Sequence, residues 1–350
     1  MSDGLVLSID GMGGDHAPDI VVEGVELAAQ AHPEVRFLIH GDPARLEALL
    51  ALASAARAAA TIVPADRVIS MDVKPSQAMR QGKGSSLWNA IASVETGEAH
   101  AIVSAGNTGA FMAIAMVRLR TMAGVHRPAL AASWPTMRGF AAVLDVGANV
   151  EADAEQLVDF AIMGEAFHRA VHGAARPKVG LLNVGAEDQK GHEEIRTAAR
   201  LLRESKLDID FHGFVEGDDI SKGNADVFVT DGFTGNIALK AAEGTARMVA
   251  HFLREGLTSN VQSKIGALIA SPALHKLRDR LDPSSVNGAV FLGLNGVVVK
   301  SHGGATGRGF AAAIEVAAKL AKSDYRDEIE RNLARLAQAE AAPAGAGETI

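Results

Sequence analysis

The chain has 350 residues, of which 48% are hydrophobic and 22% are charged, and these values exclude a disordered protein. With 34 Lys and Arg against 42 Asp and Glu, the net charge of −8 disfavours nonspecific nucleic-acid binding, and we expect no nucleic-acid partner. The lack of cysteine excludes disulfides, a Cys₄ zinc site and a thiol nucleophile.

Predicted strands and helices alternate along the first half of the chain. Residues 5–10 are predicted to form a strand, and Pro18 suits the first turn of a helix that runs to about residue 32. The pattern continues with a strand at 35–40, a helix to about residue 58, a strand at 99–104 and a helix at 108–120.

The second half repeats this alternation and then interrupts it. Strands are predicted at 141–145, 178–183 and 225–230, with helices at 154–172, 192–205 and 236–255. Residues 257–281 are predicted as two helices separated at Pro272. Strands return within 289–300, and helices at 307–322 and 325–337 follow them.

This order of elements is typical of an α/β fold with a doubly wound, mostly parallel sheet, a Rossmann-like α/β/α sandwich. We expect one domain over residues 1–337, with a helical hairpin inserted at about 257–281 and a flexible tail at 338–350. In such sheets ligands bind beyond the carboxyl ends of the strands.

The sequence predicts a soluble, cytoplasmic protein. No Lys or Arg precedes Arg36, so the charged start of a secretory leader is missing. The longest apolar run, at 109–117, has nine residues, whereas a membrane-spanning helix needs about 20.

The loop after the first predicted strand is rich in glycine. Gly13 and Gly14, followed by Asp15 and His16, stand just before a helix, where backbone N–H groups can approach an anion. His16 breaks the GxGxxG pattern of dinucleotide-binding loops. The alternative is a tight turn that needs glycine for its backbone conformation.

A basic segment follows at 74–86. It includes Lys74 and Lys83, and it superficially resembles the ATP-binding Walker A loop. Gln77 and Gly84 replace two residues that this motif requires, so ATP chemistry is disfavoured. The alternative is a solvated basic loop.

Two similar loops each close a strand and open a helix. The first contains Ser104, Gly106, Asn107 and Thr108; the second contains Asp231, Thr234 and Asn236. Backbone amides, hydroxyls and side-chain amides are the donors that hold a phosphate or a developing oxyanion. Asn and Thr also cap helices, but the repetition of the pattern favours binding.

Three further patterns bear on the chemistry of the chain. Lys190 precedes Gly191 and a helix, where it could reach the same anion or lie on the surface. His168 and His172 have metal-ligand spacing, but Arg169 replaces the Glu of HExxH, so we expect no metal site and a helix-terminal cation instead. No GxSxG elbow is present, which disfavours a serine hydrolase.

Taken in order, these segments resemble one family over residues 5–325, the phosphate acyltransferase (PlsX) family. The matching segments are DGMGGDHAP, KPSQAMRQGKGSS, VSAGNTGAFMA, HRPALA, LDVGANV, LLNVGAEDQKG, FVEGDDI, DVFVTDGFTGNIALK and DPSSVNGAVFLGLNGVVVKSHG. Val286 and His192 depart from the commoner family pattern, which could alter the pocket near the acyl chain.

The resemblance implies a fold like that of isopropylmalate dehydrogenases and phosphotransacetylases, a homodimer, and no cofactor. It implies an enzyme that makes acyl-phosphate from acyl–acyl carrier protein and inorganic phosphate. The product passes to a membrane glycerol-3-phosphate acyltransferase in phospholipid synthesis.

Direct attack of phosphate on the thioester is the simplest mechanism for a chain without cysteine or a serine elbow. One preorganised oxyanion donor can contribute about 3–4 kcal/mol. Candidate phosphate-binding groups are Gly13, Gly14, Asp15, Lys74, Lys83, Ser104, Gly106, Asn107, Thr108 and Lys190. Thr234 and Asn236 are candidate oxyanion donors, and either His16 or Asp231 could orient or deprotonate phosphate.

A short apolar stripe in the inserted helices predicts weak contact with the inner face of the membrane. Val261, Ile265, Leu268 and Ile269 share one helical face, with Lys264, Lys276, Arg278 and Arg280 nearby. The alternative is helix packing or a dimer interface.

Three other functions remain possible from the sequence. They are a phosphotransacetylase that uses coenzyme A, an NAD-dependent hydroxy-acid dehydrogenase on a related fold, and a non-catalytic membrane adaptor.

Overall fold

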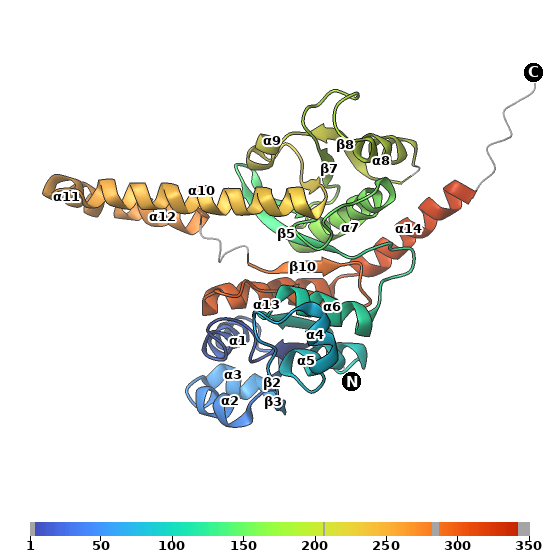
Figure 1. The fold of residues 1–350 in the computed structure, drawn as a ribbon. Coiled ribbons are helices and arrows are strands. Elements are labelled where there is room, and N and C mark those ends of the chain that lie inside the picture. The colour runs from blue at the N-terminus through green and yellow to red at the C-terminus, as the bar shows by residue number, and fades with distance from the viewer. Residues whose placement is uncertain (1–3, 206, 282–286, 342–350) are drawn as a thin grey trace, which may run out of the picture.

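The computed structural model describes residues 4–205, 207–281 and 287–341, which form an eleven-stranded sheet with helices on both faces (Figure 1). The strands are β1 (Val6–Asp10), β2 (Arg36–Gly41), β3 (Ala60–Pro64), β4 (Ala101–Ser104), β5 (Ala129–Thr136), β6 (Gly139–Leu144), β7 (Lys178–Leu182), β8 (Asp210–Val215), β9 (Val227–Val229), β10 (Ala289–Leu292) and β11 (Val297–Lys300). The helices are α1 (Asp19–Ala31), α2 (Pro43–Leu50), α3 (Ser54–Ala59), α4 (Pro75–Gln81), α5 (Ser86–Glu95), α6 (Thr108–Leu119), α7 (Ala154–His172), α8 (Glu193–Glu204), α9 (Gly217–Lys222), α10 (Gly232–Thr258), α11 (Val261–Ile269), α12 (Ser271–Leu281), α13 (Gly307–Lys322) and α14 (Tyr325–Ala341).

The sheet consists of two parallel halves joined by antiparallel strands. Its order is β3-β2-β1-β4-β11-β10-β5-β6-β9-β7-β8. The pairs β11–β10, β10–β5 and β5–β6 are antiparallel, and the remaining pairs are parallel. The predicted mostly parallel, doubly wound sheet is therefore confirmed. The antiparallel centre was not predicted, and it reverses the strand direction of the second half.

Two apolar clusters hold helices to the two faces of the sheet. One contains side chains of α1, α7 and α13, and the other contains side chains of α5 and α6. Helices α1 and α13 pack closely at Gly24, where a Cβ would lie 2.8 Å from the Cβ of Phe310. Glycine is needed here because a larger residue would push the helices apart.

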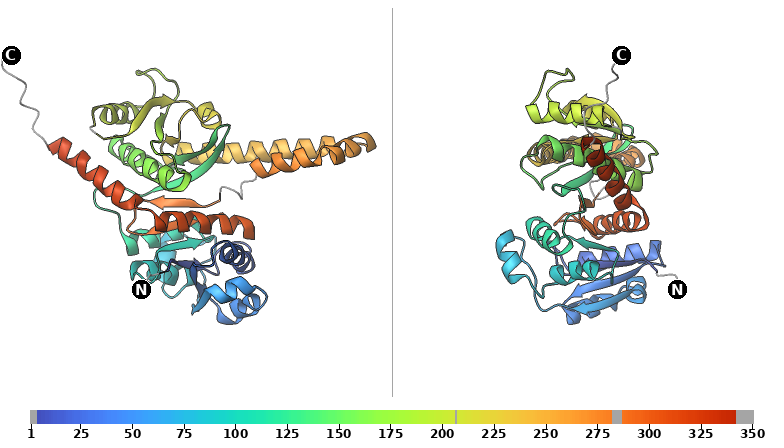
Figure 2. Two further views of the ribbon diagram at one scale, coloured as in Figure 1. Left: turned by 180° about the vertical axis from the view of Figure 1, so that it is seen from behind. Right: turned by 90° about the vertical axis from the view of Figure 1, so that its right-hand side faces the viewer.

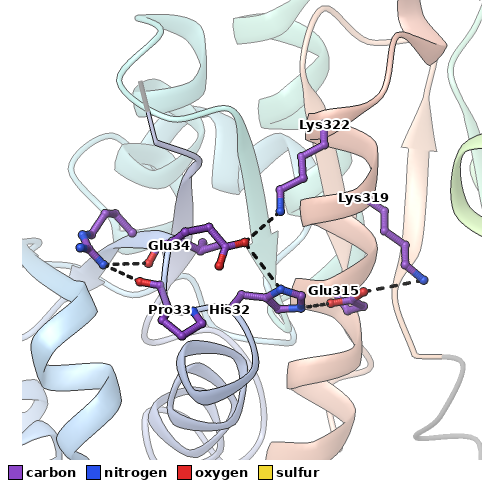
Figure 3. A network of polar contacts seen from close by, with 8 residues as sticks. His32, Pro33, Glu34, Glu315, Lys319 and Lys322 are labelled. Carbon is purple, nitrogen blue, oxygen red and sulfur yellow. Dashed lines mark hydrogen bonds and ion pairs between the residues drawn. The ribbon is translucent and has the colours of Figure 1, made fainter. Parts of the chain in front are cut away.

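Ion pairs at the surface add to the contact between α1 and α13 (Figure 3). His32 lies 2.5 Å from Glu315, which also faces Lys319 at 3.7 Å. Glu34 pairs with Lys322 at 3.1 Å. These side chains are partly exposed, so solvent screens the pairs and their contribution to the free energy of unfolding is small.

Helices α10, α11 and α12 form a helical arm that extends away from the sheet (Figures 1 and 2). The helix predicted to begin at Asn236 begins at Gly232 and continues to Thr258, because Asp231 caps its first turn. A break at residues 259–260 separates α10 from α11, and a second break at Ala270 separates α11 from α12, close to the separation predicted at Pro272. Helices α11 and α12 run back beside the end of α10. In the part of the chain that the structure describes, none of the helices is long and apolar enough to cross a membrane.

Candidate active site

Three neighbouring strands, β1, β4 and β11, end at a buried polar cluster of Asp10, Ser104 and Lys300, here called the strand-end cluster. Each residue is the last of its strand, and the parallel register aligns Lys300 with Ser104. The Ser104 hydroxyl donates to Asp10 Oδ2 at 2.7 Å and accepts from the N–H of Gly106 at 3.0 Å. All three side chains are less than 9% exposed. This edge of the sheet is where a doubly wound fold binds its ligand.

Glycine backbone, rather than larger side chains, packs against this cluster. A Cβ at Gly13 would lie 2.3 Å from Asp10 Oδ2 and 2.9 Å from the Gly106 nitrogen. Gly14 has a φ of +116° and packs against Ala105. The predicted loops at Gly13–Gly14 and Ser104–Gly106 therefore lie together, with the close backbone approach that anion binding by N–H groups needs.

Asn107 joins a fourth segment to this edge. Its side-chain oxygen accepts from the Ala110 N–H and caps α6. Its Nδ2 donates to the carbonyls of Met71 and Val73, each at 2.8 Å, and more distantly to that of Ser70. Both ends of the side chain are thus engaged within the protein, so this geometry makes Asn107 a residue that positions the loops.

Burial shifts the pKa values of both ionisable residues in the strand-end cluster. Loss of solvent lowers the pKa of Lys300 to about 8, although Asp10 and Asp15 oppose this shift. Burial raises the pKa of Asp10 from its usual value, against hydrogen bonds from Ser104 and the Met12 N–H and the nearby charge of Lys300. Perturbed ionisable groups of this kind are typical of functional sites.

Asp10 and Lys300 were not among the predicted site residues. The available signal was a charged residue that closes a short apolar strand: VLSID for Asp10 and VVVK for Lys300. Such a residue is buried only when the next strands supply partners, which the strand order provides.

A second polar cluster lies at the ends of β6 and β9. Asp145 accepts hydrogen bonds from the N–H groups of Leu130, Gly147, Ala148 and Asn149, and from the Asn149 side chain. Burial raises the pKa of Asp145, and these backbone N–H groups oppose the rise. Asp145 and Asn149 were also not predicted as site residues, because their role depends on a nest of backbone groups that the sequence does not reveal.

The predicted residues of the second loop gather here. Asp231 accepts from the N–H and the hydroxyl of Thr234, both at 2.8 Å. Asn236 donates from its side chain to the Val146 carbonyl at 3.1 Å. As predicted, this loop closes a strand, β9, and opens a helix, α10, and Asn236 also connects it to the loop after β6.

Lys190 lies in the loop after β7. Its Nζ is 3.0 Å from Glu187, and the Asn183 side chain donates to its carbonyl. Between the described residues, no hydrogen bond or ion pair connects Lys190 or the second cluster with the strand-end cluster. A shared phosphate site that includes Lys190 remains a prediction.

The remaining predicted binding residues lie at the surface near the first loops. Asp15 and His16 are exposed, and the Asp15 N–H donates to the Gly303 carbonyl at 3.0 Å. Thr108, Lys74 and Lys83 are exposed as well. Val286 lies outside the described residues.

The helical His pair has internal partners. His168 contacts the Phe140 carbonyl at 3.0 Å, and His172 contacts the Ser133 hydroxyl at 2.9 Å. Burial lowers the pKa of His172 to about 4, so the predicted helix-terminal cation is wrong for His172, which is neutral near pH 7. Among the residues that the structure describes, no three His, Cys, Asp or Glu side chains lie close enough together to hold a metal ion.

Solved structures with a similar fold are phosphotransacetylases. The EutD phosphotransacetylase from Staphylococcus aureus matches with a TM-score of 0.61 and 18% identity, over 91% of this chain and 95% of that one. A phosphotransacetylase from Streptococcus pyogenes matches with a TM-score of 0.61 and 16% identity, over 92% and 95%. At this identity the likeness shows the fold alone, and it confirms the predicted phosphotransacetylase-like architecture.

Sequence relatives are much closer. A phosphate acyltransferase from Caulobacter vibrioides is 62% identical over 349 residues, 99% of this chain and 97% of the relative. Another from Phenylobacterium zucineum is 55% identical over 336 residues, 96% and 95% of the two chains. A family model described as fatty acid synthesis protein matches residues 5–327. This chain therefore belongs to the fatty acid synthesis protein family, together with relatives named phosphate acyltransferase.

Proposed function

We propose that this chain is a phosphate acyltransferase that moves an acyl group from a thioester to inorganic phosphate. The observation that carries the proposal is the near full-length identity of 62% to a phosphate acyltransferase. The glycine-lined loops over the strand-end cluster support it, because they offer backbone N–H groups to an anion.

The proposed reaction is a direct transfer. A phosphate oxygen attacks the thioester carbonyl carbon, an oxyanion forms, and the C–S bond then breaks to give acyl-phosphate and a thiolate that takes up a proton. No cysteine is present to form a thioester with the enzyme. The protein contributes by holding the two substrates together and by stabilising the oxyanion.

Roles in this reaction follow from the two clusters. The amides of Gly13 and Gly14 hold phosphate, while the Gly106 N–H donates to the Ser104 hydroxyl at 3.0 Å and fixes the neighbouring loop. Asn236 acts as an oxyanion donor through its second amide hydrogen, since the first donates to the Val146 carbonyl. Thr234 serves as a second donor only when its hydroxyl turns away from Asp231, to which it now donates at 2.8 Å. For both clusters to act in one reaction, their loops must face the same bound phosphate and thioester.

We propose acyl–acyl carrier protein as the acyl donor. The purified chain is assayed for phosphate-dependent thiol release with matched acyl–acyl carrier protein and acyl-coenzyme A substrates. A clear preference for the carrier protein supports the proposal, whereas preference for a short acyl-coenzyme A points to a phosphotransacetylase. NADH binding measured by fluorescence, with no thiol release from either donor, would favour a dehydrogenase.

Turnover is expected to need no divalent metal. Loop amides and a lysine can neutralise the single phosphate, which is the role a metal would otherwise take. Dialysis against a chelator should leave the rate unchanged, with a mock-dialysed sample as control. A loss of activity that zinc or magnesium restores would refute this expectation.

We also propose that the helical arm mediates homodimer formation and weak membrane contact. Among the described residues of α10, Met248, Val249, Phe252 and Leu253 are exposed, which suits a second copy of the chain. On α11, Val261, Ile265, Leu268 and Ile269 are between 55% and 76% exposed. Lys264 and Lys276 are exposed nearby and suit anionic headgroups; the side chains of Arg278 and Arg280 lie outside the described part.

The α11 contact predicts that changing Ile265 and Leu268 together to Glu reduces co-sedimentation with anionic vesicles. The double change removes apolar area and adds negative charge to a short stripe. Dimerisation is followed in parallel by analytical ultracentrifugation. Unchanged vesicle binding by a folded dimer contradicts the membrane contact, and loss of the dimer instead identifies α11 as an interface.

A further inference from the structure

Lys300 is a buried lysine that has no role in the mechanism proposed above. It is 7% exposed, and its Nζ donates to the Ala105 carbonyl at 3.3 Å and to the Ser301 carbonyl. Buried lysines are uncommon and need partners, because burial penalises the charged ammonium. Two carbonyls satisfy two of its three N–H donors, which leaves one donor for a further acceptor.

The side chain lies where the three strand-end loops meet. Ala105, which Lys300 holds, precedes Gly106 and packs against Gly14. The loop after β11 is joined to the first loop, because the Gly303 carbonyl accepts from the Asp15 N–H. Loss of the Lys300 contact to Ala105 would therefore release the backbone against which Gly14, with its proposed phosphate-binding amide, packs.

Two carboxyl groups face this ammonium, Asp10 from β1 and Asp15 from the first loop. Asp10 is itself buried, and burial raises its pKa, which weakens it as a counter-ion. Asp15 is exposed, so solvent screens its charge. The ammonium thus retains positive charge for an arriving anion.

We propose that Lys300 is a positioning residue for phosphate: its ammonium fixes the Ala105–Gly106 backbone and supplies the buried positive charge beside it. The inference rests on the proposed function, since it takes phosphate as the ligand of these loops. Lysine binds phosphate as a point charge, and the interaction strengthens where water is excluded.

The proposal has a pH signature that a purely structural lysine lacks. Burial lowers the pKa of Lys300 to about 8, so the group is charged below that pH and neutral above it. Phosphate affinity should therefore be highest near pH 7 and fall as the pH rises through about 8. Because phosphate itself passes from monoanion to dianion near neutral pH, the signature is the fall in wild-type affinity relative to a Lys300→Arg protein, which stays charged throughout.

The test is calorimetric titration of the full-length chain with inorganic phosphate at about pH 7 and about pH 10. The wild type should lose about tenfold in affinity between them. Lys300→Met should lose about tenfold near pH 7 and little more at high pH. Lys300→Arg should keep its affinity at both, because arginine stays charged. Circular dichroism checks the fold of each variant.

Two further lysine variants sharpen the result. Lys322→Met removes an exposed lysine that pairs with Glu34 at the surface, and it should behave as wild type. Lys190→Met should leave the fall in affinity above pH 8 in place, because Lys300 is intact. A folded Lys300→Met protein with wild-type affinity, or with the wild-type pH dependence, overturns the inference.

Failure of this inference is separable from failure of the proposed function. If the wild type forms acyl-phosphate but Lys300→Met binds phosphate normally, only the role of Lys300 is wrong. If phosphate binding depends on Lys300 but no acyl-phosphate forms from any thioester, the inference stands and the proposed reaction is wrong.

Discussion

Changing Asn107 to Ala is expected to lower kcat/KM by about a hundredfold while the protein stays folded. The substitution removes the cap of α6 and frees the carbonyls of Met71 and Val73, each held at 2.8 Å. The loss of the cap alone costs about 1 kcal/mol of folding stability, which a domain of this size tolerates. The larger effect comes from displacement of the loops that surround the strand-end cluster.

Two variants show whether the amide group itself is needed. Asn107→Asp keeps an oxygen for the Ala110 N–H but loses the donor to the carbonyls, so it should be as impaired as Asn107→Ala. Asn295→Ala removes another side-chain amide that holds one carbonyl, that of Thr121 at 2.9 Å, and it should retain wild-type turnover. Wild-type kcat/KM in a folded Asn107→Ala protein would show that the site assignment is wrong.

Gly13→Ala is expected to reduce turnover by at least about a hundredfold, because a shift of about 1 Å in a reacting group can cost that much. The new Cβ would lie 2.3 Å from Asp10 Oδ2 and 2.9 Å from the Gly106 nitrogen. The carboxyl group or the loop must therefore move. Phosphate KM and kcat are both measured, and phosphate KM should rise.

The matched control is Gly217→Ala. A Cβ at Gly217 meets no atom within 4 Å, so this change adds the same methyl group without displacing the backbone. It should leave both kinetic constants unchanged. If Gly13→Ala turns over as well as Gly217→Ala, the first loop does not contact phosphate.

The sequence predicted the elements that carry strong local signals. The helices beginning near Pro18 and at Thr108, and the loops that precede them, are where the sequence placed them, because glycine, proline and capping residues act locally. Strands β3, β5 and β8 were missed. Strand β5 (ALAASWPT) has Leu130 as its only large aliphatic residue and contains Pro135, so its place in the centre of the sheet depends on its antiparallel neighbours.

Only part of the site was predicted, again because local patterns are visible in the sequence and the pairing of distant strands is not. Gly13, Ser104 and Gly106 were expected to converge, and parallel neighbours β1 and β4 bring them together. The sequence could not show that the antiparallel strands β10 and β5 reverse the strand direction in the second half of the sheet. Lys190 therefore follows β7, which runs opposite to β1 and β4. Lys300 was missed because its burial arises from the pairing of β11 with β4, far apart in sequence.

The most direct test of the account is to mix the purified chain with acyl–acyl carrier protein, with and without inorganic phosphate. Acyl-phosphate is followed by phosphorus NMR, and the intact protein by mass spectrometry. The account predicts that acyl-phosphate and free carrier thiol appear together, only when phosphate is present, and that the chain gains no acyl group. Thiol release without phosphate, accompanied by an acylated form of the chain, would contradict direct transfer.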